Sequence, residues 1–568
     1  MKLPARVSVL LFCALAPAFA QGSGTSFYDD YGSVIIVFGL IAAFLGFGYI
    51  LQVRGWKPKE KGFSFQLPQP PQDTYGSADF AEPVPFMPDQ LYVFGGVFFG
   101  KSSTPGPAHL GPFVGHEGGP ICSLPESHSI IVSPTRSGKG TRVLIPTLLR
   151  YATGSALVID PKGENAAVTA RARMALGQKV HLINPWGELS PTFQKLGLQN
   201  ATYNPLDILD RDDPNAVATA QALASAICPK EKGGKDAYWS DSAASVLTAV
   251  LLWLADEPGE QKTLGRAREI VTKTRKEFVG EYLTKMAKSS SFDGAIRENA
   301  APFIDLAQET YSGVMSNLGQ HTKFLSDPQV KRATATSSFS MTDLMKGPTT
   351  VYVVIPPDRM DTQRTWLRLL ITAGMQTYKH GTTGSVNRCM FMIDEFPALG
   401  RLDELPRDIA TMSGYGVDFV LVVQGLDQLK DVYGDARSTI LSNCAYKWFC
   451  NIKDLDSAQY LSKTLGKTTV PTTSKSTSLG HNPGGGSSGQ STTHGETGRD
   501  LLMPDEIMNL GRDTAILLNP TKRPDYLRTV DYWNLQTAFA YLEDIEAYNH
   551  VYWGSRPLQF DPNPYHKS

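Results

Sequence analysis

Residues 133–142, SPTRSGKGTR, have the residue types of a phosphate-binding loop, with two departures from the usual pattern G-x-x-x-x-G-K-[ST]. Ser133 stands in place of the first glycine, and Gly140 stands in place of the hydroxyl residue that binds magnesium. An apolar run precedes the loop and a helical pattern follows it, so backbone N–H groups at the helix start would face an anion. Lys139 would then reach the β- and γ-phosphates of a nucleotide. On its own, the pattern is also compatible with a chance match.

The predicted ATP-binding surface consists of consecutive residues of this loop: Thr135, Arg136, Ser137, Gly138, Lys139, Gly140 and Thr141. Because Gly140 has no hydroxyl, Thr141 is the nearest side chain in the loop that could hold Mg²⁺.

A second motif, FMIDEFPALGRL at residues 391–402, ends an apolar run with Asp394 and Glu395. Asp394 could hold the hydration shell of Mg²⁺, and Glu395 could act as general base for the attacking water. By itself, an acidic pair after a strand is also an ordinary feature. A lysine loop after one strand and an Asp-Glu pair after a later one, however, are the two halves of a P-loop ATPase. The combination predicts ATP hydrolysis with Lys139, Asp394 and Glu395 as catalytic residues.

Gln424 ends the apolar run VDFVLVVQ, which follows the acidic pair along the chain. A polar amide at a strand tip beside a γ-phosphate could sense hydrolysis, and we include Gln424 among the predicted catalytic residues. The ordinary alternative is a polar residue that simply ends a strand.

Seven short apolar runs predict the strands that must hold these residues. They cover residues 129–133, 155–160, 179–185, 349–356, 388–394, 417–424 and 514–520. Their few polar residues are typical of parallel strands covered by helices on both faces, and helical patterns alternate with them, so the predicted fold class is α/β. Residues 213–340 keep helical periodicity without strands, which predicts an inserted all-α domain. Residues 473–498, rich in Gly, Ser and Thr, predict a flexible loop.

The N-terminal region is apolar in two places. Residues 7–20 follow Lys2 and Arg6 and end in a small-x-small site, which is typical of a signal peptide or a short first membrane helix. Residues 31–53 contain no charge and are long enough to span a bilayer, with a buried soluble helix as the alternative. Basic residues follow from Arg54 onward, which predicts that this end of the span is cytoplasmic.

The expected organisation is therefore a membrane-anchored cytoplasmic enzyme. The segments, in order, are a signal-like segment or first membrane helix (1–20), a short periplasmic loop (21–30), a transmembrane helix (31–53), a Pro/Gly-rich connector (54–126), the first part of a nucleotide-binding domain (127–212), the all-α domain (213–340), the second part of the nucleotide-binding domain (341–540) and a C-terminal tail (541–568). The formal net charge is -1, so any DNA contact must come from a local basic patch. The six scattered cysteines form no C-x-x-C pair, which argues against a zinc site or a disulfide framework.

Several strings occur in an order that resembles type IV secretion and conjugation coupling proteins, the TraG/VirD-type P-loop ATPases. They are SPTRSGKGTRVLIPTLL, VIDPKGEN, NPLDIL, YWSDSAASVLTAVLLWL, MIDEFPALGRL, VVQGLDQLKDVYG, ILSNCAYKWFC, YLSKTLGKTTV and GRDLLMPDEIMNL. The resemblance implies a RecA-like nucleotide domain with an inserted all-α domain, ATP and Mg²⁺ as ligands, and a ring of six copies with nucleotide between neighbours. It also implies that Asp160, in VIDPKGEN, frames the site. The family often has G-K-G in the loop, which accounts for Gly140.

One departure from the family concerns a trans-acting arginine. Some relatives have an arginine before the Gly-Tyr-Gly segment that leads into the glutamine strand, whereas this chain has Ser413 there. Arg401, Arg407 or a residue from elsewhere would have to take that part.

The function that the resemblance implies is an inner-membrane coupling ATPase. It would recruit a relaxase bound to single-stranded DNA, effector proteins, or both, to a type IV secretion channel and use ATP hydrolysis in the transfer. One alternative is a septal-type DNA translocase, although the chain ends at residue 568 without room for the C-terminal reader of that class. The other is a nucleotide-binding substrate receptor without motor activity, against which the Asp394-Glu395 pair argues.

Overall fold

The computed structural model describes residues 74–81, 96–103, 117–151, 153–230, 234–381, 386–482 and 485–534. All of them belong to the second of two compact units, residues 71–568. The predicted segments 1–20, 21–30 and 31–53, and the tail 541–568, lie outside the described residues. Within the described ranges, none of the helices combines the length and the apolar character that a membrane crossing requires.

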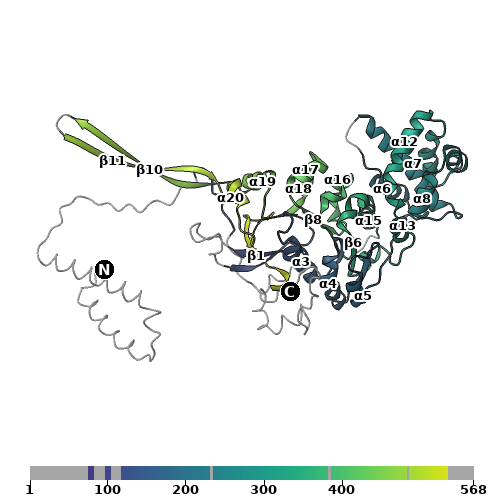
Figure 1. Cartoon of the computed structure of the whole chain (residues 1–568), viewed down its shortest axis with the longest axis horizontal. Helices are drawn as coiled ribbons and strands as arrows, with labels where there is room; N and C mark the ends of the chain where they lie inside the picture. Colours follow the sequence, from purple (N-terminus) through teal and green to yellow (C-terminus); the bar gives the residue numbers. More distant parts are fainter. Residues whose placement is uncertain are drawn as a thin grey trace, which may run out of the picture. The chain divides into compact units, whose positions relative to one another are not determined.

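Eleven strands form one mixed sheet in the order β2-β1-β13-β12-β9-β3-β8-β7-β4-β6-β5, and Figure 1 labels β1, β8 and β6 among them. Their bounds are β1 Phe98–Ser103, β2 Glu117–Cys122, β3 His128–Val132, β4 Ser155–Pro161, β5 Lys179–Ile183, β6 Thr349–Ile355, β7 Cys389–Ile393, β8 Val417–Val423, β9 Cys444–Cys450, β12 Thr514–Leu518 and β13 Asp525–Arg528. The strands from β9 to β5 are parallel, whereas β12, β13, β1 and β2 pair antiparallel at the other edge. The predicted α/β class with a parallel sheet is therefore confirmed.

One prediction about strands needs correction. The run 514–520 was expected to be parallel, but β12 pairs antiparallel with both β9 and β13. The pairing with β13 follows from the short turn that joins the two strands. A parallel connection needs a longer crossover. Within the predicted connector 54–126, the described residues include two short strands, β1 and β2, which pair at the edge of the main sheet.

Helices cover both faces of the parallel strands, and alternate strand residues pack into two different cores. In β6, Val351, Val353 and Ile355 join the larger core, and Tyr352 and Val354 join the smaller one. This alternation follows from the two-residue period of a strand. The smaller core contains α3 (Ile145–Arg150) and α4 (Glu164–Ala175); the larger contains α15 (Met360–His380), α16 (Leu405–Met412) and α17 (Leu426–Tyr433).

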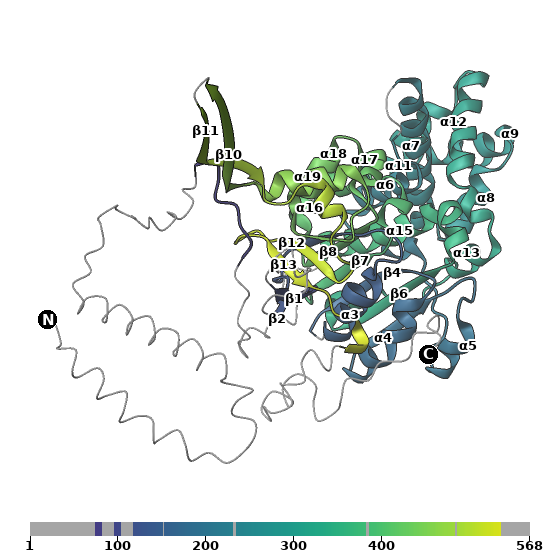
Figure 2. The ribbon, with the colours of Figure 1, turned by 60° about the vertical axis from the view of Figure 1, so that its left-hand side comes forward.

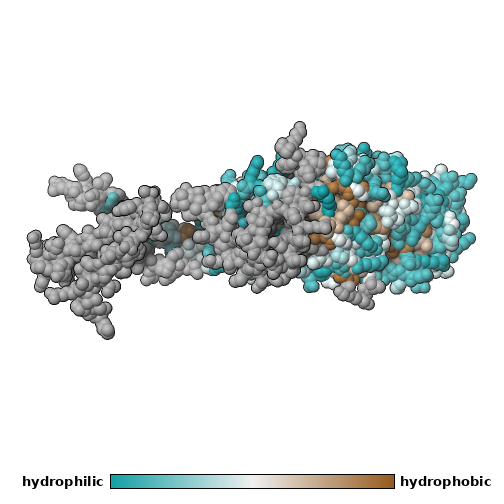
Figure 3. Space-filling model, turned by 90° about the horizontal axis from the view of Figure 1, so that it is seen from below, coloured by the Kyte–Doolittle hydropathy of each residue, from teal (hydrophilic) through white to brown (hydrophobic). Residues whose placement is uncertain are grey.

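The chain between β5 and β6 is helical. After α5 (Ser190–Lys195), the helices are α6 Ala216–Ile227, α7 Gly234–Asp256, α8 Leu264–Val271, α9 Arg275–Glu277, α10 Thr284–Met286, α11 Ala295–Ala300, α12 Gln308–His321, α13 Pro328–Ala333 and α14 Asp343–Lys346. Their apolar residues, such as Leu223 of α6 and Leu247 of α7, share the larger core with Trp366 of α15. The helical insertion is thus packed onto the sheet domain through α15, as Figure 2 shows. Hydrophilic residues predominate on its outer surface (Figure 3).

The segment 473–498 is not a loop in the structure but most of a two-stranded hairpin, β10 (Lys467–Asn482) and β11 (Gly485–Asp500). The segment 473–498 has too few apolar residues to form a packed core. Main-chain pairing does not need such a core, and β-branched threonines favour the extended backbone. At the base, Ser77 bridges Thr468, and the Ala78 N–H donates to the Lys467 carbonyl at 2.9 Å. The helices α18 (Ala436–Asn443), α19 (Leu455–Leu465) and α20 (Pro504–Met508) complete this region.

Candidate functional site

The loop that carries Lys139 joins β3 to a helix that begins with a wide turn. Residues Gly140–Leu144 form a π-helical turn, in which the Ile145 N–H donates to the Gly140 carbonyl, before α3 begins. Pro146 lies in the first turn of α3, and the wider turn accommodates a ring that cannot donate a hydrogen bond. Gly138 has φ 88° and Arg136 has φ 59°, so the loop turns through left-handed backbone at two positions.

Ser133, the residue at the first glycine position, holds the loop against the sheet. It is fully buried, and its hydroxyl donates to the Cys450 carbonyl of β9 at 3.0 Å. The Ser133 and Ser137 Oγ atoms are 2.5 Å apart, and the Ser137 hydroxyl donates to the Pro134 carbonyl at 2.6 Å. The serine therefore pins the loop through hydrogen bonds that a glycine could not make.

Lys139, Asp394 and Glu395 converge at the carboxyl edge of the sheet, because β8 lies between β3 and β7 and all three strands are parallel. The Lys139 Nζ atom lies 2.5 Å from Glu395 Oε1 and 3.3 Å from Asp394 Oδ1. Glu395 has φ 63°, a left-handed conformation that is unfavourable for a residue other than glycine and that often marks a functional site.

The charges at this edge influence one another strongly. Burial lowers the pKa of Lys139, but Asp394 and Glu395 outweigh that effect and raise it above the usual lysine value. Burial raises the pKa of Asp394, and the Lys139 ammonium only partly opposes this. Asp394 Oδ1 is buried and accepts no hydrogen bond among the described residues, although Lys139 is near it. An oxygen of this kind is a suitable acceptor for a water of a hydrated Mg²⁺, so the donor set fits the predicted metal.

Gln424 lies beside the acidic pair, at the tip of β8. Its amide Nε2 donates to Glu395 Oε2 at 2.8 Å, and its backbone N–H donates to Gln428 Oε1 at 3.2 Å. Glu395 is thus held by Lys139 on one oxygen and by Gln424 on the other.

The hydroxyl of Thr141, the predicted Mg²⁺ ligand, donates to Asp531 Oδ1 at 2.7 Å. Arg142 Nε lies 3.1 Å from the same oxygen, and its guanidinium also pairs with Asp513 at 2.7 Å. Because this bond uses only the hydrogen of the hydroxyl, the oxygen lone pairs of Thr141 remain available to a metal ion. At Gly140 an added Cβ would meet no atom within 4 Å, so this chain's own fold does not require glycine there.

Asp531 is a residue that the sequence motifs did not identify. It follows β13 and lies almost 400 residues from Thr141 along the chain. Asp531 lies beside the Lys139 loop because β12 and β13 pair antiparallel at the edge of the sheet. No local sequence pattern indicates that Asp531 contacts Thr141.

Asp160 is the second-to-last residue of β4, next to β7, and is completely buried. It accepts hydrogen bonds from the backbone N–H groups of Asn165 and Ala166 at 3.2 and 2.8 Å. Burial raises its pKa to about 8 in spite of those donors, and the nearby Asp394 adds to the rise. The carboxyl group holds the start of α4 beside the acidic pair.

Among the described residues, no hydrogen bond or ion pair joins Lys139 to any of the three positions considered for a trans-acting arginine. Ser413 precedes β8, at the opposite edge of the sheet, where its hydroxyl donates to Asp418 and accepts from Arg388. Arg401 pairs with Asp403 at 2.6 Å, and Arg407 is exposed on α16.

The family model described as "Type IV secretory system Conjugative DNA transfer" matches residues 96–552. Protein VirD4 of Rhizobium radiobacter is 27% identical over 452 residues, which cover 78% of this chain and 61% of that protein. The conjugal transfer protein TraG of Escherichia coli is 30% identical over 403 residues, covering 67% and 61%. The chain therefore spans about 61% of the length of these relatives.

The fold is similar to that of the plasmid coupling protein TrwB. The TrwB structure in complex with the non-hydrolysable ATP analogue ADPNP aligns with a TM-score of 0.54 at 16% identity, covering 72% of this chain and 86% of that one. The TrwB structure with ADP and Mg²⁺ aligns with a TM-score of 0.53 at 15% identity, covering 72% and 85%.

Proposed function

The chain belongs to the family of type IV secretory system conjugative DNA transfer proteins, and on this premise we propose that it is a coupling ATPase. It would bring relaxase-bound single-stranded DNA, protein substrates, or both to a type IV secretion channel and drive their transfer by ATP hydrolysis. The observation that carries the proposal is the convergence of Lys139, Asp394, Glu395 and Gln424 at one edge of the sheet, although they come from three separate strand ends.

We infer that Lys139 changes partners when a nucleotide binds. Without ligand, its ammonium neutralises Asp394 and Glu395. A triphosphate offers more negative charge and several oxygens to the same ammonium, which would then leave Glu395. Glu395 loses its cation in that step and becomes a stronger acceptor for the proton of the attacking water. In this way the enzyme would be inactive until its substrate is in place.

Mg²⁺, where bound, would neutralise charge that develops on the phosphate oxygens. Asp394 would hold it through the buried Oδ1, and the Thr141 oxygen would contribute a lone pair while its hydrogen is donated to Asp531. Gln424 keeps one oxygen of Glu395 in place and so orients the other toward the water. Asp160 holds the start of α4 through the Ala166 N–H, beside the end of β7 that precedes Asp394 and Glu395.

We also propose the assembly and location that the resemblance implies. Six copies would form a ring at the bacterial inner membrane, with nucleotide between neighbours and an arginine from the adjacent copy at the phosphates. The anchor would be the uncharged segment 31–53, and the channel components of the secretion system would be its partners there. The TrwB structures contain ADP with Mg²⁺ and an ATP analogue, which supports the same ligands for this chain.

ATP hydrolysis by the purified full-length chain, measured with and without single-stranded DNA, tests this function. We expect Mg²⁺-dependent turnover that DNA increases several-fold, because a transfer motor should hydrolyse ATP when cargo is present. Omission of Mg²⁺ is the control and should abolish turnover. Nucleotide binding without any turnover under all these conditions would instead identify a receptor that has no motor activity.

A further inference from the structure

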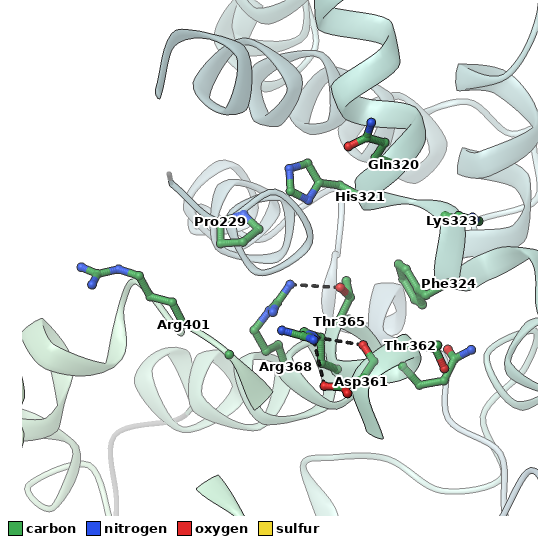
Figure 4. A pocket seen from close by; sticks show the side chains of 13 residues that line it. Pro229, Gln320, His321, Lys323, Phe324, Asp361, Thr362, Thr365, Arg368 and Arg401 are labelled. Carbon is green, nitrogen blue, oxygen red and sulfur yellow. Dashed lines mark hydrogen bonds and ion pairs between the residues drawn. The ribbon is translucent and has the colours of Figure 1, made fainter. Parts of the chain in front are cut away.

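A second site lies away from Lys139, where the helical insertion meets the sheet domain. A cavity of about 530 Å³ opens between the end of α12, Pro229 just beyond α6, the start of α15 and the turn that follows the acidic pair (Figure 4). Its lining residues include His321 on one side, Arg368 on α15 opposite, and Gly400 with Arg401 from the turn. The volume is within the range of a pocket for a small organic ligand or one nucleotide unit.

The lining is strongly positive. Four cations and one carboxylate contribute to it: Lys323, Arg364, Arg368, Arg401 and Asp361. Asp361 holds Arg364 at 2.9 Å, and Arg401 pairs with Asp403 outside the lining. Burial, with a further contribution from the Arg368 guanidinium, lowers the pKa of His321. In a chain with a net charge of -1, such a local excess of positive charge is the kind of patch that nucleic acid would require.

Arg368 is the buried centre of the site, with 3% of its surface exposed. It donates to the Ala226 carbonyl and the Leu399 carbonyl at 2.9 Å each, and to Thr365 Oγ1 at 3.0 Å. A guanidinium has further N–H donors beyond these three. Because Leu399 follows Glu395 by one short turn of helix, Arg368 connects α6 of the insertion directly to the turn after the acidic pair.

The remaining lining could accommodate a base. Phe324 and Pro229 supply apolar surface, and Gln363 is buried with a side-chain oxygen that accepts no hydrogen bond among the described residues. An unsatisfied amide oxygen can accept from the N–H donors at the edge of a nucleobase. Oligomers of acidic amino acids have no such donors in their side chains at neutral pH.

We propose that this cavity binds single-stranded DNA, with Lys323, Arg364 and Arg368 on the phosphates and Phe324 and Gln363 toward a base. The inference rests on the proposed function, to which it adds the place where the DNA strand contacts the chain. Through Arg368 and the Leu399 carbonyl, a strand bound here adjoins the turn that carries Glu395.

The test compares binding of a fluorescein-labelled oligothymidylate by the full-length chain and by the double variant Lys323→Ala/Arg364→Ala, without nucleotide. Both side chains are exposed, so the variant should fold and melt as the unmodified chain does. Loss of two phosphate contacts should weaken binding about tenfold and reduce the slope of log K against log salt by about 1.4. The charge-preserving variant Lys323→Arg/Arg364→Lys should retain the slope.

The matched control is Lys276→Ala/Lys288→Ala, which removes two exposed lysines of the insertion that do not line the cavity. Its affinity and salt slope should equal those of the unmodified chain. If Lys323→Ala/Arg364→Ala bound the labelled DNA with the affinity and salt slope of the unmodified chain, the proposal would be overturned. Displacement of the labelled DNA by oligoglutamate as readily as by unlabelled oligothymidylate would overturn it in favour of an acidic peptide. Since binding is measured without ATP, a chain that lacks ATPase activity would count against the proposed function alone.

Discussion

Replacement of Glu395 by glutamine is expected to reduce ATP turnover by the full-length chain by at least about 10²-fold, because an amide cannot accept the proton of the attacking water. Nucleotide binding should persist or become tighter. Glutamine has nearly the same size, and Lys139 loses one of the two carboxylates that compete with phosphate for its ammonium. Steady-state ATP hydrolysis and equilibrium binding of a fluorescent ATP analogue measure the two effects separately.

Glu309→Gln is the control for this substitution, because Glu309 is an exposed residue of α12. It should hydrolyse ATP at the rate of the unmodified chain. If Glu395→Gln kept a third or more of the original turnover, Glu395 could not be the general base, and the ion pair with Lys139 would have only a structural role.

Replacement of Lys139 by alanine is expected to remove most of the affinity for ATP. A charged hydrogen bond contributes about 1.5–3 kcal/mol, which corresponds to a loss of affinity of roughly 10- to 150-fold. The substitution also leaves the buried Asp394 without its nearest cation, so the pKa of Asp394 should rise further. Calorimetric titration with ATP and Mg²⁺ measures the affinity.

Lys346→Ala provides the comparison, because the Lys346 side chain is 70% exposed. It lies just before β6, at the amino ends of the parallel strands and so away from Lys139. Its affinity for ATP should not change. Equal affinities in the Lys139 and Lys346 variants would mean that the loop does not contact the phosphates, and the proposed nucleotide site would have to be abandoned.

The parallel part of the sheet could be predicted from the sequence because its strands are short, apolar and separated by helical patterns. The run 129–133, for example, corresponds to β3 at His128–Val132. The antiparallel edge could not be predicted in the same way. In β13, Asp525 interrupts the apolar pattern, and the direction of β12 depends on the turn that follows it. The parallel strand β9 was missed for a similar reason, because Lys447 interrupts its apolar pattern.

The candidate site was predictable where its residues follow the carboxyl end of a predicted strand. Lys139, Asp394 and Gln424 each follow an apolar run, and the parallel arrangement brings those ends together. Asp531 and the cavity around Arg368 were not predictable, because both arise where elements far apart in the sequence pack against each other. The hairpin at 467–500 was missed because its content of Gly, Ser and Thr indicates only that the segment cannot form an apolar core. Main-chain pairing between its two strands does not depend on that content.

Substrate transfer in living cells tests most directly whether ATP hydrolysis at the site of Lys139 and Glu395 drives that transfer. Cells that lack their own copy of the gene would receive either the unmodified gene or the Glu395→Gln variant, produced at equal levels. DNA transfer to recipient cells and export of protein substrates would then be counted in parallel. We predict that the unmodified gene restores transfer and that the variant does not, although it still binds ATP. Transfer by Glu395→Gln at the unmodified frequency would contradict the motor function.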